Sequence, residues 1–567
     1  MTSRAANRRL RLLLFFFGVV FAAVLARGLW LQGVQAASLA KLAANQHRET
    51  VTVSPARGAI YDRTGVQLAV AERATTVYAD PRSIRNPRLV ATAASRALEL
   101  DENALFGELA NRTRGFVYVE RKADPQRAEV LAERKLPGLG FYPEERRAYP
   151  LHSVAAQVLG YAGIDNRGLA GLENSLDRVL AGRPGRRTVV RDPIGRAIHV
   201  VDSGSEREGR DVHLTIDRIL QANAEAVLRR TVAEWGAKSA SAIVLDPHTG
   251  AILAMAVAPT FDANQFGAVP PDLQRNRAVT DTYEPGSTFK LVTVAGALSE
   301  RLVRPRSAFT LSPSIHIADR EIHDAEARGT ERMTVAQILS RSSNVGAVTL
   351  AQLLGPQRLM SWIGRFGFGR RTGIDFPGES RGIVLPLDRW SGSTIGNVPI
   401  GQGIAVTPVQ MAAAYAAVAN KGVWIRPHLV SRVAGEGPLR PARRRIVSRK
   451  VASQLIRMLR DVVDEGTGTK AAVPGYEVAG KTGTAAKPDA GGGYSTSRYV
   501  ASFVGLVPAS RPRLVIMVTV DEPRRTIWGG IVAAPAFQRI ASFALEYLDV
   551  PPDAPCSDPT CPPQAGR

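Results

Sequence analysis

A long apolar run near the N-terminus constrains the fold of this chain more than any other feature. Residues 12–26 are all apolar, Arg27 interrupts the run, and residues 28–31 continue it. About 20 helical residues span the roughly 30 Å of membrane hydrocarbon. Because backbone groups in lipid must pair within their own segment, residues 12–31 are expected to form a transmembrane helix.

The flanks of this run predict its orientation. Residues 1–11 carry four arginines and no acidic residue, and positive flanks of this kind stay in the cytoplasm. At the other end, Arg27 can extend to the interface beside Trp30. A cleaved signal peptide is the alternative, with a possible cleavage site at residues 34–36. The length of the run and the arginine within it favour an uncleaved anchor, with a cytoplasmic tail over 1–11 and everything after residue 31 outside the cytoplasm.

The composition and the net charge limit the classes of molecule that the chain is expected to bind. Its 567 residues, 45% hydrophobic and 22% charged, are typical of a globular protein with several domains. The net charge of +22 suits anionic lipid or an anionic wall polymer, and no run is typical of a nucleic-acid-binding or zinc module. We therefore expect no metal and no nucleic acid. Cys556 and Cys561 could form a small disulfide loop, and the sequence leaves that pairing open.

The clearest chemical signal is the stretch Tyr-Glu-Pro-Gly-Ser-Thr-Phe-Lys at 283–290. Its Pro-Gly turn leads into an apolar segment, so a helix is expected to begin near Ser287. Lys290 follows three residues later on the same helix face, where an apolar environment would disfavour its charged form and let it act as a base for the serine. A second Ser-x-x-Lys, at Ser38, lies in a polar segment and is interpreted as coincidence.

Two further elements follow in order. Ser342 and Asn344 form a Ser-x-Asn element in an expected turn, and residues 481–484 read Lys-Thr-Gly-Thr after an expected strand. The set of Ser-x-x-Lys, Ser-x-Asn and Lys-Thr-Gly is similar to that of β-lactamases and penicillin-binding proteins.

Secondary-structure patterns predict an α+β fold with antiparallel hairpins. A polar, Gly-rich junction is expected at 203–210, and the proline-rich tail over 549–567 is expected to be disordered. The expected strands are 211–217, 241–246, 251–257, 476–480, 499–507 and 513–520, and the expected helices include 218–235 and 536–548.

Motifs before the junction make the resemblance more specific: they resemble those of class B penicillin-binding proteins. The resemblance implies a non-catalytic pedestal over 49–205 and a transpeptidase domain over 211–548, in which helices sandwich an antiparallel sheet. Residues 136–147, 323–324, 521–523 and 529–530 are similar to the division type (FtsI-like). The motifs lie at 57–69, 136–138, 145–150, 155–161, 168–173 and 191–196.

The resemblance implies acyl transfer on peptidoglycan stem peptides that end in D-Ala-D-Ala. Ser287 would be the nucleophile and Lys290 its base, and Ser342 would relay protons with the help of Lys481. β-Lactams would acylate the same serine. The resemblance also implies that no cofactor is needed. An FtsW-like glycan polymerase, division-site membrane proteins and the inner-membrane lipid are the partners that the resemblance and the anchor imply.

Four residues are expected to bind the substrate. Asn344 would hold the substrate amide, since its side chain offers both a donor and an acceptor. Thr482 and Thr484 would bind the terminal carboxylate beside the basic Lys481. Gly483 would let the strand approach the substrate closely. The backbone N–H groups of Ser287 and Thr484 would form the oxyanion hole.

Three alternatives stay open at this point. An elongation-type class B transpeptidase shares the motif set, although we see no large insertion of that type. A β-lactam hydrolase shares Ser-x-x-Lys and Lys-Thr-Gly, although it needs neither anchor nor pedestal. A non-catalytic membrane sensor or scaffold could bind wall peptides without turning them over.

Overall fold

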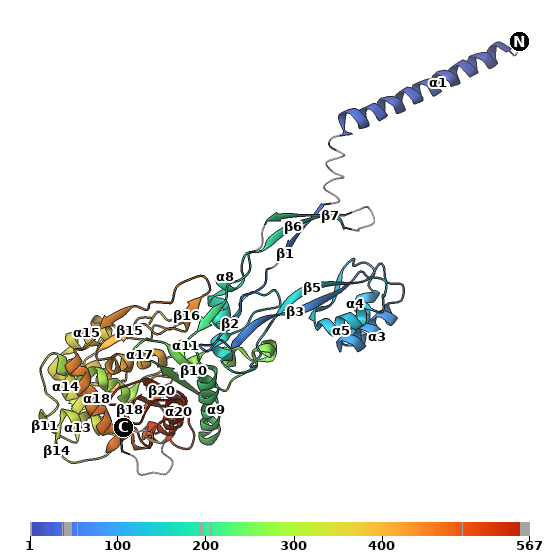
Figure 1. Cartoon of the computed structure of the whole chain (residues 1–567). Helices are drawn as coiled ribbons and strands as arrows, with labels where there is room; N and C mark the ends of the chain where they lie inside the picture. Colours follow the sequence, from blue (N-terminus) through green and yellow to red (C-terminus); the bar gives the residue numbers. More distant parts are fainter. Residues whose placement is uncertain are drawn as a thin grey trace. The chain divides into compact units, whose positions relative to one another are not determined.

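The computed structural model describes residues 3–36, 38, 48–53, 55–191, 197–204, 207–489 and 491–555. The chain forms two compact units. One comprises Met1–Ala56 with Gly182–Gly209, and the other comprises Arg57–Ala181 with Arg210–Arg567. Figure 1 shows the elements of both units.

The first unit contains the apolar helix. Helix α1 (Ser3–Leu29) continues into a π-helical turn, η1 (Trp30–Val34). Within Asn7–Val34, an 18-residue window has a mean hydropathy of 2.4, and none of that window is buried inside the protein. Large apolar side chains such as Phe15 and Phe21 are exposed. A helix of this length and composition fits the expected single-pass membrane anchor.

A three-stranded antiparallel sheet completes the first unit. Its order is β1-β6-β7. The strands are β1 (Arg48–Val53), β6 (Gly185–Arg191) and β7 (Ala197–Gly204).

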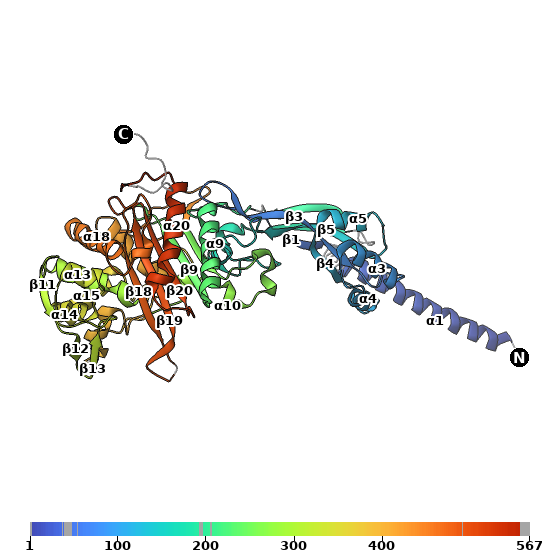
Figure 2. The same ribbon diagram turned by 90° about the horizontal axis from the view of Figure 1, so that it is seen from below.

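The second unit is built on a five-stranded sheet in which every neighbouring pair is antiparallel. All residues of β9 and β10 are buried, because helices cover both faces. This arrangement confirms the expected antiparallel sheet between helices (Figure 2). The strands, in spatial order, are β10 (Ile252–Ala258), β9 (Ser239–Leu245), β20 (Leu514–Asp521), β19 (Tyr494–Val507) and β18 (Ala479–Pro488).

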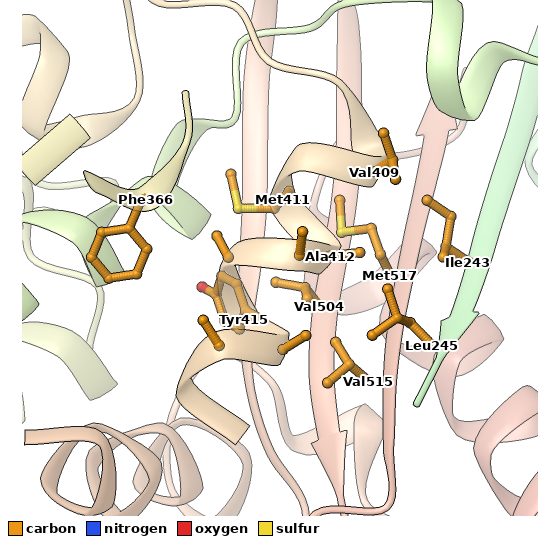
Figure 3. Packing of buried hydrophobic residues seen from close by; sticks show 14 of the residues in the cluster. Ile243, Leu245, Phe366, Val409, Met411, Ala412, Tyr415, Val504, Val515 and Met517 are labelled. Carbon is orange, nitrogen blue, oxygen red and sulfur yellow. The ribbon is translucent and has the colours of Figure 1, made fainter. Parts of the chain in front are cut away.

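Alternate side chains along the strands point to opposite faces of the sheet and belong to two separate hydrophobic cores. One face packs on α17 (Pro408–Ala419), whose Val409, Met411 and Tyr415 cluster with Ile243, Val504 and Met517 of the strands (Figure 3). The other face packs on α9 (Arg218–Trp235) and α20 (Ala534–Tyr547), whose apolar residues cluster with those of the strands between. The strands are continuously apolar because both of their faces are buried.

Helix α9 has the bounds that the sequence predicts. Its N-cap, Asp217, accepts the N–H groups of Ile219 and Leu220, and Gly236 ends the helix in the left-handed conformation. A carboxylate at the N-cap and a glycine after the last turn are the usual signals of these two ends.

A second sheet has the order β16-β8-β2-β3-β4, with β5 also paired to β3. This sheet crosses the expected junction at 203–210, because β8 and β16 come after it and the other strands come before it. Because strands from both sides of the junction share this sheet, the boundary between the expected pedestal (49–205) and the expected transpeptidase domain (211–548) stays a proposal. The strands are β2 (Ile60–Tyr61), β3 (Gln67–Ala79), β4 (Val117–Ala123), β5 (Leu139–Ala148), β8 (Val212–Leu214) and β16 (Val430–Val433).

A buried ion network joins three of the motifs before the junction. The Glu173 carboxylate accepts one hydrogen bond from Nε of Arg57 at 2.7 Å and another from Nε of Arg147 at 2.6 Å. All three side chains are at most 2% exposed. Arg57 also donates to Asp177 at 2.7 Å. Buried charges need partners of this kind, so these motif residues hold the fold together.

The remaining elements cover the two sheets or connect them. Helices α3, α4 and α5 enclose a small core of their own against β3 and β4. The bounds are α3 (Pro87–Leu98), α4 (Glu102–Ala110), α5 (Pro125–Ala132), α6 (Ala156–Leu159), α7 (Gly171–Ser175), α8 (Asp177–Leu180), η2 (Ala263–Ala268), α10 (Pro271–Gln274), α11 (Arg277–Thr280), β11 (Ala308–Leu311), β12 (Ser314–Ile317), β13 (Arg320–His323), β14 (Glu331–Thr334), α15 (Pro356–Phe366), η4 (Leu387–Arg389), α16 (Thr394–Asn397), η5 (Val398–Ile400), β15 (Val423–Ile425), β17 (Arg443–Arg445), α18 (Arg449–Asp464), η6 (Thr469–Ala471) and α19 (Gly529–Val532).

The proline-rich tail begins in contact with the second unit. Val550 accepts the hydroxyl of Tyr476, and Asp553 accepts the N–H of Glu477 at 2.8 Å. Where we expected disorder from residue 549, residues up to 553 are thus held by hydrogen bonds. Cys556 and Cys561 lie outside the described residues.

Candidate active site

Ser287 lies in a 3₁₀ turn rather than in the first turn of an α-helix. The turn, η3 (Gly286–Phe289), leads directly into α12 (Lys290–Ser299). With three residues per turn, side chains at i and i+3 eclipse each other, so Ser287 and Lys290 share one face. The turn packs closely on β18: Gly286 has a φ of +54°, and a Cβ there would lie 2.9 Å from the Thr484 carbonyl oxygen.

Lys290 follows the 3₁₀ turn and is buried, with 1% of its surface exposed. Its Nζ donates to the carbonyl oxygen of Ser342 at 2.5 Å, to Oγ of Ser342 at 3.2 Å and to Oδ1 of Asn344 at 2.7 Å. Burial lowers the pKa of Lys290 to about 7, although the negative charge of Asp324 opposes the shift. The amine is therefore a base that works near neutral pH.

The Ser-x-Asn element forms the tight turn that the sequence predicts. Helix α13 (Val335–Ser340) ends just before it, Ser342 turns the chain with a φ of +60°, and Ser343 caps α14 (Asn344–Leu354). The left-handed turn brings the carbonyl and the hydroxyl of Ser342 to the same amine. Asn344 is already engaged in part, since its Nδ2 donates to the carbonyl oxygen of His323 at 2.8 Å. One amide hydrogen stays available for a substrate.

Asp324 organises this turn, a role that the sequence did not reveal. Its carboxylate accepts the hydroxyl of Ser343 and the N–H groups of Asn344 and Val345, and Arg328 donates to it at 2.6 Å. The family resemblance singled out residues 323–324 without assigning them a function. A carboxylate at the N-terminus of α14 also suits the helix dipole.

Lys481 is fully buried in β18. Burial, and secondarily the charge of Lys290, lowers its pKa well below the usual value. Its Nζ lies 3.4 Å from Oγ1 of Thr482. We expected Lys481 both to help the proton relay and to stand as a basic group beside the carboxylate site. Its environment disfavours the cationic form, which suits the first of these roles better.

The two threonines of β18 lie at the surface of the site with partners already in place. Thr482 shares a 2.7 Å hydrogen bond between its Oγ1 and that of Thr467, and Oγ1 of Thr484 accepts the N–H of Gly529 at 3.0 Å. These contacts fix the rotamers of both hydroxyl groups, so the groups are preorganised for a ligand.

Gly483 has a neighbour that the sequence did not indicate. We expected it to let β18 approach a substrate. A Cβ at this position would instead lie 2.9 Å from the carbonyl oxygen of Pro285 and 3.0 Å from the Thr288 methyl group, and it would collide with Ser502. The close approach that this glycine allows is between β18 and the turn that carries Ser287.

An open cavity of about 580 Å³ joins these groups. Ser287, Ser342, Asn344, Thr482 and Thr484 all line it, whereas the two lysines and Gly483 lie below its surface. Its volume suits a peptide end or a small ligand. In the described part of the chain, no three His, Cys, Asp or Glu side chains are grouped to hold a metal.

The second Ser-x-x-Lys copy has a different environment. Ser38 is exposed, and its hydroxyl donates to the carbonyl oxygen of Gln35 at 2.8 Å. Lys41 lies outside the described residues. Ser38 is thus a suitable control for Ser287.

Comparison with known families and proteins covers nearly the whole chain. Residues 240–542 match the penicillin binding protein transpeptidase domain, and residues 52–214 match the penicillin-binding protein dimerisation domain. Penicillin-binding protein PbpB of Mycolicibacterium smegmatis is 38% identical over 92% of this chain and 87% of its own. Peptidoglycan D,D-transpeptidase FtsI of Escherichia coli is 34% identical over 94% of this chain and 91% of its own. The crystal structure of penicillin binding protein 3 from Mycobacterium tuberculosis with aztreonam is 32% identical and has a TM-score of 0.71, covering 89% of this chain and 99% of that one.

Proposed function

The chain belongs to the class B penicillin-binding proteins of the division type, and we propose on that basis that it cross-links peptidoglycan stem peptides during septal wall synthesis. It is a serine D,D-transpeptidase that acts through an acyl-enzyme. The buried amine of Lys290, with a pKa lowered to about 7 and a place one 3₁₀ turn after Ser287, is the observation that carries the mechanism.

In the first step, Oγ of Ser287 attacks the carbonyl carbon of the penultimate D-alanine of a donor stem peptide. The serine proton passes to Nζ of Lys290. The peptide bond to the terminal D-alanine breaks, the departing amine takes up a proton, and an ester remains on Ser287. A β-lactam presents a strained amide to the same oxygen and leaves a similar ester.

In the second step, the amine of a neighbouring stem peptide attacks that ester. A new amide forms between the two peptides, the amine loses a proton, and Ser287 regains one. Lys290 can serve both steps because a pKa near 7 lets it accept and return a proton at neutral pH.

The other site residues position the substrate and move protons. Ser342 contacts Lys290 and would pass protons to the leaving amine, with the help of Lys481. Asn344 would hold the substrate amide through its remaining hydrogen. Thr482 and Thr484 would bind the terminal carboxylate. The backbone N–H groups of Ser287 and Thr484 would stabilise the oxyanion.

Covalent labelling with a fluorescent penicillin tests this assignment. Ser287→Ala should abolish labelling while circular dichroism stays unchanged, since only one partly exposed oxygen is lost. Ser38→Ala removes the same atom from an exposed site and should label normally. Labelling that persists in Ser287→Ala would contradict the assignment.

Two kinetic measurements separate transpeptidation from the alternatives. A transpeptidase should keep its penicilloyl ester for hours, whereas a hydrolase would lose it within a second. A non-catalytic sensor would label, but it would release no D-alanine from a mixture of donor and acceptor peptides. Release of D-alanine together with a cross-linked product is the expected result.

The N-terminal helix is proposed to hold the chain in the cytoplasmic membrane at the septum, with its N-terminus inside. It is also proposed to contact an FtsW-like glycan polymerase, because Gly18 and Gly28 leave open space on the surface of α1 where another helix could approach closely. Replacing residues 1–31 with an unrelated anchor of equal length should preserve penicillin binding and abolish septation. Normal division with the replaced anchor would show that the helix only tethers.

A further inference from the structure

A second large cavity lies away from the catalytic groups. It has a volume of about 720 Å³ and is formed by the end of α15, the loop that follows it, part of α17, and the paired strands β15 and β17. Four arginines line it, and none of its lining residues is acidic; the arginines are Arg365, Arg370, Arg371 and Arg444. A cavity with four cations and no acid has a strongly positive potential.

The lining of the cavity provides these arginines with no acidic partner. Within the described ranges, none of the four forms a salt bridge. Arg444 on β17 lies opposite Trp424 on β15, with its guanidinium 4.6 Å from the centre of the indole ring, and Arg365 lies at the same distance from Trp362. Aromatic faces orient a guanidinium but leave its charge in place. Burial and the charge of Arg370 lower the pKa of Arg444, so the arrangement is electrostatically unfavourable when the cavity is empty.

The chemistry of the lining selects a class of ligand. Several guanidinium groups around one space match a compact group with more than one negative charge, and phosphate oxygens fit the planar guanidinium fork. Phe366, Phe368 and Trp424 add an aromatic wall that suits a sugar or an apolar group beside the anion. The volume lies within the range of small-molecule sites.

The cavity is also in contact with the catalytic motif. Phe368 lines it, and the Phe368 ring packs at 5.2 Å between centroids on Phe289, which stands between Ser287 and Lys290 in the sequence. Both rings are almost fully buried. Helix α15 packs on α12 as well, where Gly296 leaves room for the ring of Trp362. A ligand that displaces Phe368 would therefore press on the turn that holds the nucleophile.

We propose that this cavity binds a phosphate-bearing ligand, a phosphate ester or diphosphate, and that its occupancy changes the acylation rate of Ser287 through Phe368 and Phe289. The part of this inference that concerns acylation rests on the transpeptidase function proposed above.

Binding can be measured by titration calorimetry on the full chain in detergent micelles, with inorganic pyrophosphate as the probe. The double variant Arg370→Ala/Arg444→Ala should weaken binding at least about tenfold, since each charge-assisted contact is strong. Arg443→Ala is the matched control, because it removes the same charge from the adjacent position of β17 and does not line the cavity. No binding to the wild type, or an equal loss in the control, would overturn the proposal.

Vesicles identify the source of the phosphate. If phosphatidylglycerol vesicles compete with pyrophosphate and phosphatidylcholine vesicles do not, the ligand is a lipid headgroup. If neither competes, it is a soluble phosphate ester. Binding of an oligoglutamate peptide without binding of pyrophosphate would replace a phosphate ligand with an acidic peptide and would refute the proposal.

The coupling to catalysis has its own test. Saturating pyrophosphate should change the rate of labelling by fluorescent penicillin by at least about twofold. Phe368→Leu should still bind pyrophosphate but lose this effect. An unchanged rate in the wild type would refute the coupling. Ser287→Ala should bind pyrophosphate normally, so failure of the catalytic assignment would be distinguishable from failure of this site.

Discussion

The acylation rate of Ser287 should follow the protonation of Lys290. The pKa of about 7 in the folded protein predicts a neutral amine in about 9% of molecules at pH 6, about 50% at pH 7 and about 91% at pH 8. Only the neutral amine can accept the serine proton, so the rate should rise about tenfold from pH 6 to pH 8 and then level off. A lysine with the ordinary pKa of 10.5 would give a rate that keeps rising past pH 9.

Substitution of Asp324 tests whether the pKa of Lys290 sets the midpoint of this pH profile. Its negative charge raises the pKa of Lys290, so Asp324→Asn should move the midpoint of the profile to lower pH. Glu331→Gln, which removes a carboxylate from the lining of the same cavity, should leave the midpoint unchanged. The assay is the second-order rate constant for labelling by a fluorescent penicillin between pH 5.5 and 9.5. A wild-type midpoint above pH 9, or an upward shift in Asp324→Asn, would refute this reasoning.

Three further predictions follow from the buried groups. Lys290→Ala should slow penicillin labelling by orders of magnitude and Lys481→Ala by less, because only Lys290 contacts both Ser342 and Asn344; the reverse order would contradict this division of roles. Glu173→Gln should lower the free energy of unfolding by about 3–5 kcal/mol in urea titrations, since it removes the anion that two buried arginines share and leaves Arg57 with Asp177 alone. Gly483→Ala should slow labelling about tenfold or more with the circular dichroism unchanged, because its Cβ would push the Ser287 turn away from β18.

The local signals of this chain predicted its elements well. Helix α9 has the expected ends because both are set by adjacent residues, Asp217 and Gly236. The central strands were expected because continuous apolar runs mark strands that are buried on both faces. The same logic could not foresee that β8 pairs with β2, because a three-residue strand carries no signal of its partner.

The site was predicted in its residues but not in its contacts. The three motifs named the groups that line the cavity, whereas the bond from Lys290 to the Ser342 carbonyl depends on a left-handed turn at Ser342. Asp324 reaches α14 from twenty residues upstream, so only the folded chain reveals its role. The close approach at Gly483 likewise depends on a neighbour almost 200 residues away.

The two buried lysines have a consequence for folding as well as for chemistry. An unfolded chain would carry Lys290 and Lys481 with ordinary pKa values, so between about pH 7 and 10.5 it binds more protons than the folded chain. The contribution of these two amines to stability therefore rises as the pH rises through this window, and it falls as the pH drops toward 7. Each amine that stays neutral contributes about 1.4 kcal/mol per pH unit to that slope. The desolvation that lowers the pKa of both lysines therefore makes folding release protons. Their contribution to the free energy of unfolding is smallest at the acidic end of the pH range in which Ser287 becomes active.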